Sequence, residues 1–376
     1  MTATDSGKSG QRTISLAYSV ADQSFDSTKS LGILNLSLQL GQALSRRAEV
    51  SRFDVFSNTS LHHWHSTLTG SAVSCFDSAR ASRLGRIAWD QTGAYAQAAR
   101  SGVDWLVLPK GFASFMRRPP TRIATYVHDV MADYYRSHYR HSSSRLENWY
   151  FERSLRATLR YSSVIFTNSQ FTREELLAKC ERERRTPPPI VVAGIGFDLR
   201  LPTEHATRDR IVVLASPWPH KRTDLAIEFM QRWQARTGAD RLVDWVGRFP
   251  EGLPQPNITG WSYHTRLDEA SYQRLLGRAR VVVYVSEYEG FGMPPVEAVL
   301  HGACPVYSAL PATRETMQAS GAPFDNASFD SFEQAMTTAW TMETADIQQL
   351  AHGLLDRHHW DRVAERVMCA LVAGTQ

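Results

Sequence analysis

The stretch SEYEGFGMPPVEAVLHGACPV, residues 286–306, decides how this 376-residue chain is interpreted. It follows the apolar run RVVVYV, residues 280–285, which is uninterrupted and β-branched like a parallel strand buried on both faces. Two glycines allow a tight loop next, and a Pro-Pro pair suits the first turn of a helix, where a missing N–H costs nothing. The stretch therefore predicts a strand, a loop that carries Glu289, and a helix that carries Glu297 in its first turn.

These two carboxylates would lie where open α/β sheets bind ligands, at the carboxyl ends of the strands. A helix N-terminus favours an anion such as a diphosphate, and carboxylates accept hydrogen bonds from the hydroxyl pairs of a ribose or a sugar. Taken alone, Glu297 is better explained as a helix-capping residue and Glu289 as a solvated loop residue. The spacing, the glycines and the prolines together favour a nucleotide-sugar site.

Composition is typical of a globular protein with more than one core. Hydrophobic residues make up 43% of the chain and charged residues 21%, and the length predicts two domains. The formal net charge of +4 suits an anionic small ligand or an anionic membrane surface. It is too small to indicate nucleic acid, for which no motif is present. The four scattered cysteines form no CxxC pair or Cys/His cluster, so neither a zinc site nor a disulfide framework is expected.

The sequence also predicts a location. Its first residues, MTATDSGKSGQRT, are polar and lack the apolar segment of a signal peptide. No apolar run approaches the roughly 18 residues that span a bilayer. We expect a cytoplasmic protein with reduced cysteines, and we keep open a peripheral contact with the inner face of the cytoplasmic membrane.

Strand and helix patterns alternate along most of the chain, which predicts parallel sheets with helices on both faces. Before a central break the expected strands are 14–20, 103–109, 122–128 and 162–169, with helices at 31–45 and 170–180. After it the expected strands are 210–216, 241–247 and 280–286, with helices at 221–234, at 268–279 and from Pro294.

The break is CERERRTPPPIVVAGIGFD, residues 180–198, whose charges, prolines and glycines are typical of a linker between domains. We therefore expect an α/β protein with two Rossmann-like, doubly wound domains that face each other across a cleft. The expected parts are a disordered leader (1–12), an N-terminal acceptor domain (13–185), a C-terminal nucleotide-sugar domain (186–358) and a last helix (359–376) packing back on the first domain.

Several motifs in this order resemble the retaining glycosyltransferases of family 4, which have the GT-B fold. EGFGMPPVE resembles the E-x7-E motif of that family, and the resemblance covers most of the chain. The other matching segments are PHKRTDLAIEF (219–229), like the phosphate-binding lysine and its helix, SQFTREEL (169–176), GIGFD (194–198) and YVHD (126–129).

The resemblance implies a role for each matching side chain. Glu297 would bind the ribose of the nucleotide, and Glu289 would contact hydroxyls of the donor sugar. Lys221 would bind the donor diphosphate, where its charge adds to the field of the helix that follows. His128 would lie near the reacting sugar, although a lone histidine at a strand end is more often structural.

Further donor contacts are implied for backbone and loop positions. The resemblance places Phe291, Gly292 and Met293 at the donor, together with the backbone N–H groups of Leu31 and Gly32. For the last two residues the simpler interpretation is an ordinary helix start.

Two departures from the family pattern bear on phosphate binding. The family usually has two glycines at its first loop, where this chain has Leu31-Gly32. The family usually has an arginine shortly before its phosphate lysine, and LASPWPH before Lys221 contains none. Arg222 and Arg248 are the candidates for the second positive charge, and the simpler interpretation of each is a surface arginine.

The implied reaction is transfer of a hexose from a nucleoside diphosphate sugar to a saccharide or lipid-linked saccharide, with retention of configuration. GDP-mannose is the donor most indicated, as in mannosyltransferases of bacterial surface polysaccharide or lipopolysaccharide assembly. No D-x-D pair is present, so neither a metal nor a cofactor is expected, and we favour front-side attack. The alternatives are another GT-B enzyme, such as an epimerase or a phosphorylase, and a non-catalytic nucleotide-sugar-binding protein.

A basic, aromatic helix face suggests a membrane contact. Residues 145–160 read as a helix, and at about 100° per residue one face gathers a tryptophan among arginines, namely Arg145, Trp149, Arg156 and Arg160. The opposite face, expected to pack on the domain, carries Leu146, Tyr150 and Ala157. Such a face fits anionic lipid, and the simpler alternative is a solvated face with one exposed aromatic side chain.

Overall fold

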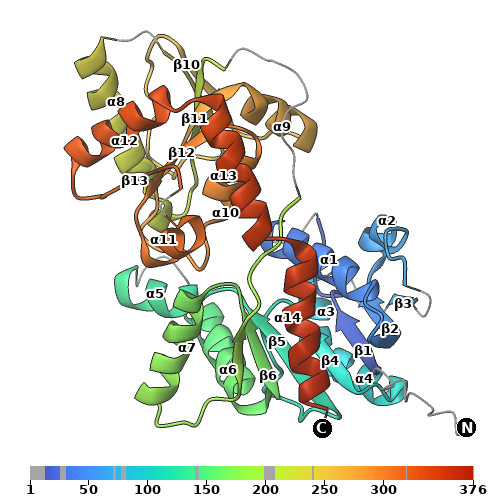
Figure 1. Cartoon of the computed structure of the whole chain (residues 1–376). Coiled ribbons are helices and arrows are strands. Elements are labelled where there is room, and N and C mark those ends of the chain that lie inside the picture. The colour runs from blue at the N-terminus through green and yellow to red at the C-terminus, as the bar shows by residue number, and fades with distance from the viewer. Residues whose placement is uncertain are drawn as a thin grey trace, which may run out of the picture.

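The computed structural model of the chain describes residues 13–25, 31–70, 73–77, 82–139, 144–198, 208–238, 241–318 and 320–375. The chain forms two α/β domains, the C-terminal one above the N-terminal one in Figure 1. The leader expected over residues 1–12 lies outside the described residues. No helix within the described ranges is both long and apolar enough to cross a membrane.

The N-terminal domain is built on a seven-stranded parallel sheet with the order β3-β2-β1-β4-β5-β6-β7. Its strands are β1 (Ile14–Ser19), β2 (Val50–Ser57), β3 (Val73–Asp77), β4 (Trp105–Leu108), β5 (Arg122–Val127), β6 (Val164–Thr167) and β7 (Ile190–Val192). The strand order reverses between β1 and β4, which makes this pair the topological switch point of the domain. The boundary expected between residues 185 and 186 lies before β7, the last strand of this sheet.

Helices cover both faces of this sheet. They are α1 (Leu31–Ser45), α2 (His62–His65), α3 (Arg83–Ala88), α4 (Ala94–Ser101), α5 (Met131–His138), α6 (Arg145–Tyr161) and α7 (Gln170–Arg182), with a π-helical turn (Trp89–Gly93) between α3 and α4. Successive residues of β1 point to opposite faces, so Tyr18 joins the core that includes Leu34 and Leu40 of α1, and Ala17 joins the core that includes Tyr95 of α4.

The C-terminal domain repeats this plan with six parallel strands in the order β10-β9-β8-β11-β12-β13. The strands are β8 (Arg210–Leu214), β9 (Leu242–Val246), β10 (Trp261–His264), β11 (Ala279–Tyr284), β12 (Cys304–Ser308) and β13 (Ala322–Phe324). The helices are α8 (Thr223–Thr237), α9 (Glu269–Arg278), α10 (Met293–Leu300), α11 (Pro311–Met317), α12 (Phe329–Thr341) and α13 (Thr344–Arg357). The switch point lies between β8 and β11, and the strand, loop and helix expected around residues 280–300 are confirmed.

Two segments cross between the domains side by side. The first, after β7, meets the second, before α14 (Trp360–Ala373), where the Phe197 N–H donates to the His358 carbonyl at 2.7 Å. A side chain at Gly196 would collide with the Trp360 ring, so glycine permits this close approach. Helix α14 packs against α1, β6 and β7 and runs down the N-terminal domain in Figure 1.

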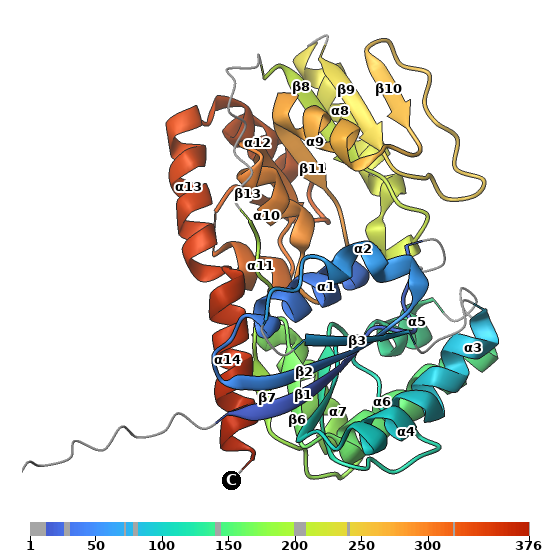
Figure 2. The same ribbon diagram turned by 90° about the vertical axis from the view of Figure 1, so that its right-hand side faces the viewer.

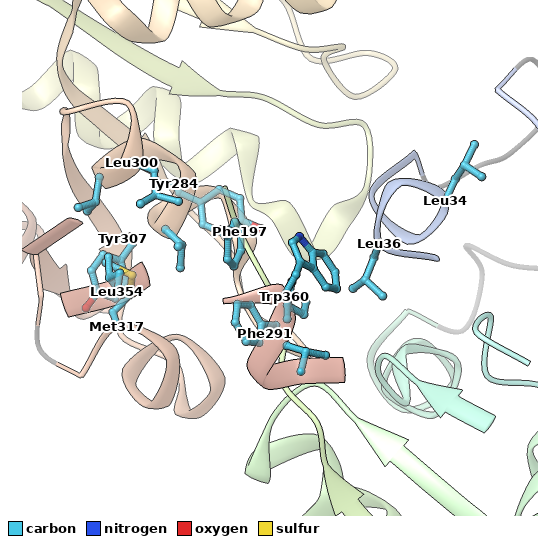
Figure 3. Close-up of a cluster of buried hydrophobic side chains, with 14 of the residues drawn as sticks. Leu34, Leu36, Phe197, Tyr284, Phe291, Leu300, Tyr307, Met317, Leu354 and Trp360 are labelled. Atoms are coloured by element: carbon cyan, nitrogen blue, oxygen red, sulfur yellow. The ribbon is translucent and has the colours of Figure 1, made fainter. Parts of the chain in front are cut away.

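The hydrophobic core is continuous through this crossing. Figure 3 shows Trp360 between Phe291 of the C-terminal domain and Leu36 of α1, and all three side chains are buried in one cluster. Figure 2 shows α1 on the side of the N-terminal domain that faces the C-terminal domain. The two domains are therefore packed together rather than joined by a linker alone.

Helix α6 confirms the helix expected over residues 145–160, but its faces differ from the expectation. Leu146, expected to pack on the domain, is 71% exposed beside Trp149 at 49%. The buried residues of α6 begin only at Ser154, so its first turn lies before the part that the domain covers. Arg156, expected to be a free surface charge, is paired with Glu152 at 2.9 Å and with Glu183 of α7 at 3.2 Å.

Candidate functional site

The switch point of the C-terminal domain holds the predicted lysine and glutamate together. Lys221 lies between β8 and α8, and Glu289 lies between β11 and α10, so both follow the two strands at which the sheet order reverses. The Lys221 Nζ is 2.6 Å from the Glu289 Oε1, and the Tyr284 hydroxyl donates to the same oxygen at 2.5 Å. The Lys221 ammonium also lies over the Tyr284 ring, 4.9 Å from its centre.

Glu289 is charged in spite of its burial. Burial by itself raises the pKa of Glu289, but the Lys221 ammonium and hydrogen bonds from Lys221, Tyr284 and Ser286 outweigh it and hold that pKa below its ordinary value. The site is therefore an ion pair that presents one oriented cation and one oriented anion.

The loop that carries Glu289 is fixed to the turn that carries Lys221. The Glu287 N–H donates to the His220 carbonyl at 2.7 Å, and the Ser286 hydroxyl donates to the same carbonyl at 3.2 Å. The Asn326 side-chain amide donates to the Ser286 carbonyl at 2.7 Å. These bonds hold the two charged residues in place before any ligand arrives.

The same loop closes on the N-terminal domain. The Gly290 carbonyl accepts hydrogen bonds from the Ser169 hydroxyl at 2.5 Å and the Thr172 hydroxyl at 3.2 Å. A side chain at Gly290 would collide with the His128 carbonyl, so glycine is required for this approach. The loop that carries Glu289 and the segment that carries His128, predicted from distant motifs, thus lie against each other at the domain interface.

His128 is a neutral, oriented imidazole. Its Nε2 lies 2.7 Å from the Pro109 carbonyl, which only accepts, so Nε2 carries the proton and Nδ1 is left as an acceptor. Burial lowers the pKa of His128 to about 4, although the bond to Pro109 acts in the opposite sense. The ring also lies against Tyr126, with 4.9 Å between ring centres.

Asp129, which no sequence argument singled out, follows His128 at the interface. Burial raises the pKa of Asp129, and the charge of Glu289 adds to this effect. Its carboxylate accepts from the Met131 N–H at 2.9 Å at the start of α5. The YVHD segment contained this residue, but only its histidine had been assigned a role.

Tyrosines on and after α5 bind the C-terminal domain and were not predicted. The Tyr135 hydroxyl lies 2.6 Å from the His220 Nδ1. The Tyr134 and Tyr139 hydroxyls donate to the Glu287 carboxylate, the former at 3.4 Å. The YYRSHY run could have indicated an aromatic surface, but not the residues that it meets.

Arg222, a candidate for the second phosphate cation, is neutralised by two carboxylates. Its guanidinium lies 2.5 Å from Glu287 and 3.0 Å from Asp224. The other candidate, Arg248, is exposed in the loop after β9, the strand beside β8, and makes no ion pair with any described residue. Arg248 is therefore the cation that a ligand could engage without breaking an existing pair.

Two predicted positions lie near helix starts. Glu297, expected in the first turn of its helix, lies in the second turn instead, because α10 begins at Met293 and has no acidic residue in its first turn. Glu297 is partly buried, and its charge contributes to raising the pKa of Tyr284, after burial and the nearby Glu289. Gly32 lies in the first turn of α1, where an added side-chain carbon would meet nothing within 4 Å. Packing alone therefore gives no reason for glycine at position 32.

The three loop residues predicted to bind the donor differ in what they expose. Phe291 packs its ring on Phe197 and His358 in the core shown in Figure 3, so only its backbone remains for a donor contact. Gly292 has φ of +88° and precedes α10, and Met293 is the partly buried first residue of that helix. Within the described ranges, no group of three or more His, Cys, Asp and Glu could hold a metal ion.

Comparison with known proteins bears on the fold. No family model matches the chain, and no curated protein matches its sequence. Among solved structures, HepE from Anabaena in complex with UDP and glucose matches at 15% identity and a TM-score of 0.65, over 96% of this chain and 100% of that one. The N-terminal domain of trehalose-6-phosphate phosphatase from Candida albicans matches at 11% identity and 0.63, over 97% of both chains.

A third structure, the E. coli trehalose-6-phosphate structure bound with UDP-2-fluoro glucose, matches at 11% identity and a TM-score of 0.59, over 96% of this chain and 99% of that one. At such low identity these likenesses establish the arrangement of the chain and not its substrate. Both sheets have the strand order of a doubly wound domain. The chain has the GT-B fold, as two packed Rossmann-like domains.

Proposed function

We propose that the protein is a glycosyltransferase that moves a hexose from a nucleoside diphosphate sugar to an acceptor hydroxyl. The observation that carries the proposal is the Lys221–Glu289 pair, which is fixed at the switch point of one domain. The next residue, Gly290, packs on the carbonyl of His128 of the other domain. An open α/β sheet binds its ligands at such a point. The GT-B neighbours solved with UDP, with glucose or with UDP-2-fluoro glucose support the same class of donor.

The ion pair gives a physical account of donor binding. Without a ligand, Lys221 and Glu289 satisfy each other. A diphosphate carries more negative charge than Glu289 and would draw the ammonium, assisted by the N-terminus of the 15-residue helix α8. Glu289, released from the ammonium, would then accept hydrogen bonds from hydroxyls of the donor sugar.

His128 would contribute an acceptor and not a proton. With Nε2 bonded to Pro109, the free Nδ1 can accept a hydrogen bond from a hydroxyl of the sugar. Its low pKa keeps the ring uncharged at neutral pH, so it would orient the sugar without adding a second cation. The reaction would form a bond between the acceptor oxygen and the anomeric carbon as the bond to the phosphate breaks, and the departing diphosphate would take the acceptor proton.

We assign the second phosphate-binding charge to Arg248. Arg222 would have to leave Glu287 and Asp224 first, whereas Arg248 is exposed and unpaired within the described chain. Glu297 would bind the ribose from α10, and backbone groups of Gly32, Gly292 and Met293 would approach the donor. Retention of configuration, front-side attack and independence from metals remain parts of this proposal.

The sequence motifs and the structural neighbours indicate different donors. The sequence motifs resemble enzymes that use GDP-mannose, while the structural neighbours were solved with UDP or a UDP-sugar. A thermal-shift screen with GDP, UDP, ADP and dTDP and their sugars decides between them. A ligand present at 100 times its Kd stabilises the fold by about 2.7 kcal/mol. The donor proposal fails if none of these nucleotides raises the melting temperature.

The alternative enzymes are separated by their products. An epimerase would return an isomerised nucleotide-sugar with its diphosphate intact, and a phosphorylase with bound pyridoxal would show its absorbance. A non-catalytic binding protein would bind the donor and leave it unchanged. The proposed transferase releases nucleoside diphosphate at a rate that rises with a suitable acceptor.

We also propose a cytoplasmic protein that touches an anionic membrane through the start of α6. Leu146 and Trp149 are exposed there, and Phe115, whose ring meets Trp149 at 5.5 Å, is followed by the 67%-exposed Met116. Four exposed arginines flank this apolar surface: Arg117, Arg118, Arg145 and Arg153. Apolar side chains among arginines fit the headgroup region of anionic lipid, where a lipid-linked acceptor would reside.

A further inference from the structure

The switch point of the N-terminal domain also carries an ion pair, and donor binding does not use it. Asp22 follows β1 and Lys110 follows β4, the two strands between which the sheet order reverses. The Lys110 Nζ lies 2.5 Å from the Asp22 Oδ2 and 3.3 Å from the carboxylate of Asp90, in the turn between α3 and α4. The Asp22 side chain is 4% exposed, whereas that of Lys110 is 37% exposed.

This arrangement repeats the donor pair of the other domain. There too a lysine and a carboxylate follow the two switch strands, and Lys221 and Glu289 lie 2.6 Å apart. The crevice at a switch point is where a doubly wound sheet binds its ligand. A protein with two such points offers an oriented ion pair at each, and a transferase requires two ligands.

His128 lies between the two pairs along a short chain of contacts. On one side, the backbone of Gly290, next to Glu289, packs on the His128 carbonyl. On the other side, the His128 Nε2 donates to the Pro109 carbonyl at 2.7 Å, and Lys110 is the next residue. A ligand at Lys110 would therefore border the imidazole that the donor sugar is proposed to meet.

A purely structural role explains this cluster poorly. The Asp22 carboxylate loses its hydration on burial, and replacing a buried ion pair by apolar side chains is often neutral or stabilising. Burial, and next to it the charge of Asp22, raises the pKa of Asp90 to about 7, which shows how poorly one ammonium compensates the two acids. Groups that gain from a further polar partner are better explained by a ligand.

The chemistry of the cluster selects the ligand class. Two carboxyl groups beside one ammonium would repel a phosphate, because the charges already present are at most balanced. Sugar hydroxyls fit, since they donate to carboxylates and accept from the ammonium. We propose that Asp22, Lys110 and Asp90 form the acceptor subsite and that it takes an uncharged sugar ring. The assignment rests on the proposed glycosyltransferase function and names its acceptor class.

The test measures acceptor binding apart from donor binding. The variants are Asp22→Asn, which keeps the shape of the side chain, and Lys110→Met. The matched control is Arg52→Met, because Arg52 is also a partly exposed cation, 46% exposed and 2.7 Å from the fully buried Asp54 of the same domain. Calorimetry with UDP and with GDP reports on the donor site and on correct folding.

Acceptor binding is measured by saturation-transfer NMR with the better nucleotide present. The probes are the methyl α-glycosides of glucose, mannose and galactose, with glucose 6-phosphate as the charged competitor. We expect wild type and Arg52→Met to bind at least one glycoside, and Asp22→Asn and Lys110→Met to bind it at least about 10-fold more weakly, since each loses a charge-assisted hydrogen bond. Nucleotide affinity should be equal in all four proteins.

Three results would overturn the acceptor assignment. In the first, both cluster variants bind the glycoside as tightly as wild type does. In the second, wild type binds nucleotide but none of the three glycosides. In the third, glucose 6-phosphate binds at the cluster more tightly than the glycosides. Absence of UDP and GDP binding in wild type would instead count against the proposed function itself.

Discussion

Replacing Lys221 with methionine removes the ammonium from the donor site and keeps an unbranched side chain that is one atom shorter. It leaves the Glu289 carboxylate buried, with a hydrogen bond from the Tyr284 hydroxyl but without its cation. The substitution therefore acts on stability and on donor binding through the same atom.

The expected loss of stability in Lys221→Met follows from the burial of the Lys221–Glu289 pair. Removing one partner of a fully buried ion pair costs about 3–5 kcal/mol. The Lys221 side chain is 21% exposed and Tyr284 still donates to Glu289, so we expect the free energy of unfolding to fall by about 1–3 kcal/mol. The double variant Lys221→Met, Glu289→Gln leaves no unpaired buried charge and should be at least as stable as the single variant.

The effect on the reaction should be larger. Loss of one preorganised group that stabilises developing charge lowers the rate by about 10²–10³-fold, which is about 3–4 kcal/mol in the barrier. Nucleoside diphosphate affinity should fall as well. The assay is calorimetry for the diphosphate, with transfer followed by release of that diphosphate from the donor found in the screen.

The control removes a positive charge from the same domain without touching the site. Arg274 is exposed on α9 and donates to the Ser271 hydroxyl at 2.8 Å, so Arg274→Met should retain wild-type affinity and rate. Unchanged diphosphate affinity in Lys221→Met, or an equal loss in Arg274→Met, would refute the assignment of Lys221.

Four further outcomes are expected. Glu297→Gln should weaken binding of nucleoside monophosphate, whereas Glu289→Gln should mainly lower turnover, and equal losses of monophosphate binding would contradict that division. Transfer should survive EDTA, and loss of transfer that magnesium or manganese restores would contradict the metal-free proposal. The His128 ring should show no NMR titration between pH 5.5 and 8. An unfolded histidine takes up a proton near pH 6.5 and the folded His128 only near pH 4, so the free energy of unfolding should fall as the pH drops from about 6.5 to about 4, and less steeply in His128→Gln. Wild type should co-sediment with anionic vesicles at low salt, and Trp149→Ala should remain in the supernatant. The control Leu242→Glu, at an exposed leucine of the other domain, should co-sediment like wild type. Wild type that stays in the supernatant would refute the membrane contact.

Much of the donor site could be predicted from local sequence because its parts follow strands. The run before Ser286 is apolar and β-branched throughout, so β11 and the helix after it could be placed from the pattern alone. The sequence placed Lys221 and Glu289 each after a strand, and the observed strand order, with its reversal between β8 and β11, accounts for their contact.

Contacts between the domains could not be predicted from such patterns. The bond between Tyr139 and Glu287 joins residues 148 positions apart, and its formation depends on how the two sheets face each other. Within the N-terminal domain, the contact between Asp22 and Lys110, 88 positions apart, likewise depends on the order of the strands in the sheet. Helical periodicity likewise placed Leu146 on a face but could not tell that the domain leaves that turn uncovered.

The central claim is that the site around Lys221 and Glu289 transfers a hexose from a nucleoside diphosphate sugar. Phosphorus and proton NMR on one reaction, wild type with UDP-glucose or GDP-mannose and the glycoside that it binds, tests it most directly. The account predicts release of nucleoside diphosphate together with a new glycosidic bond that retains the anomeric configuration of the donor. Donors that remain unconsumed, or an isomerised sugar still attached to its diphosphate, would contradict it.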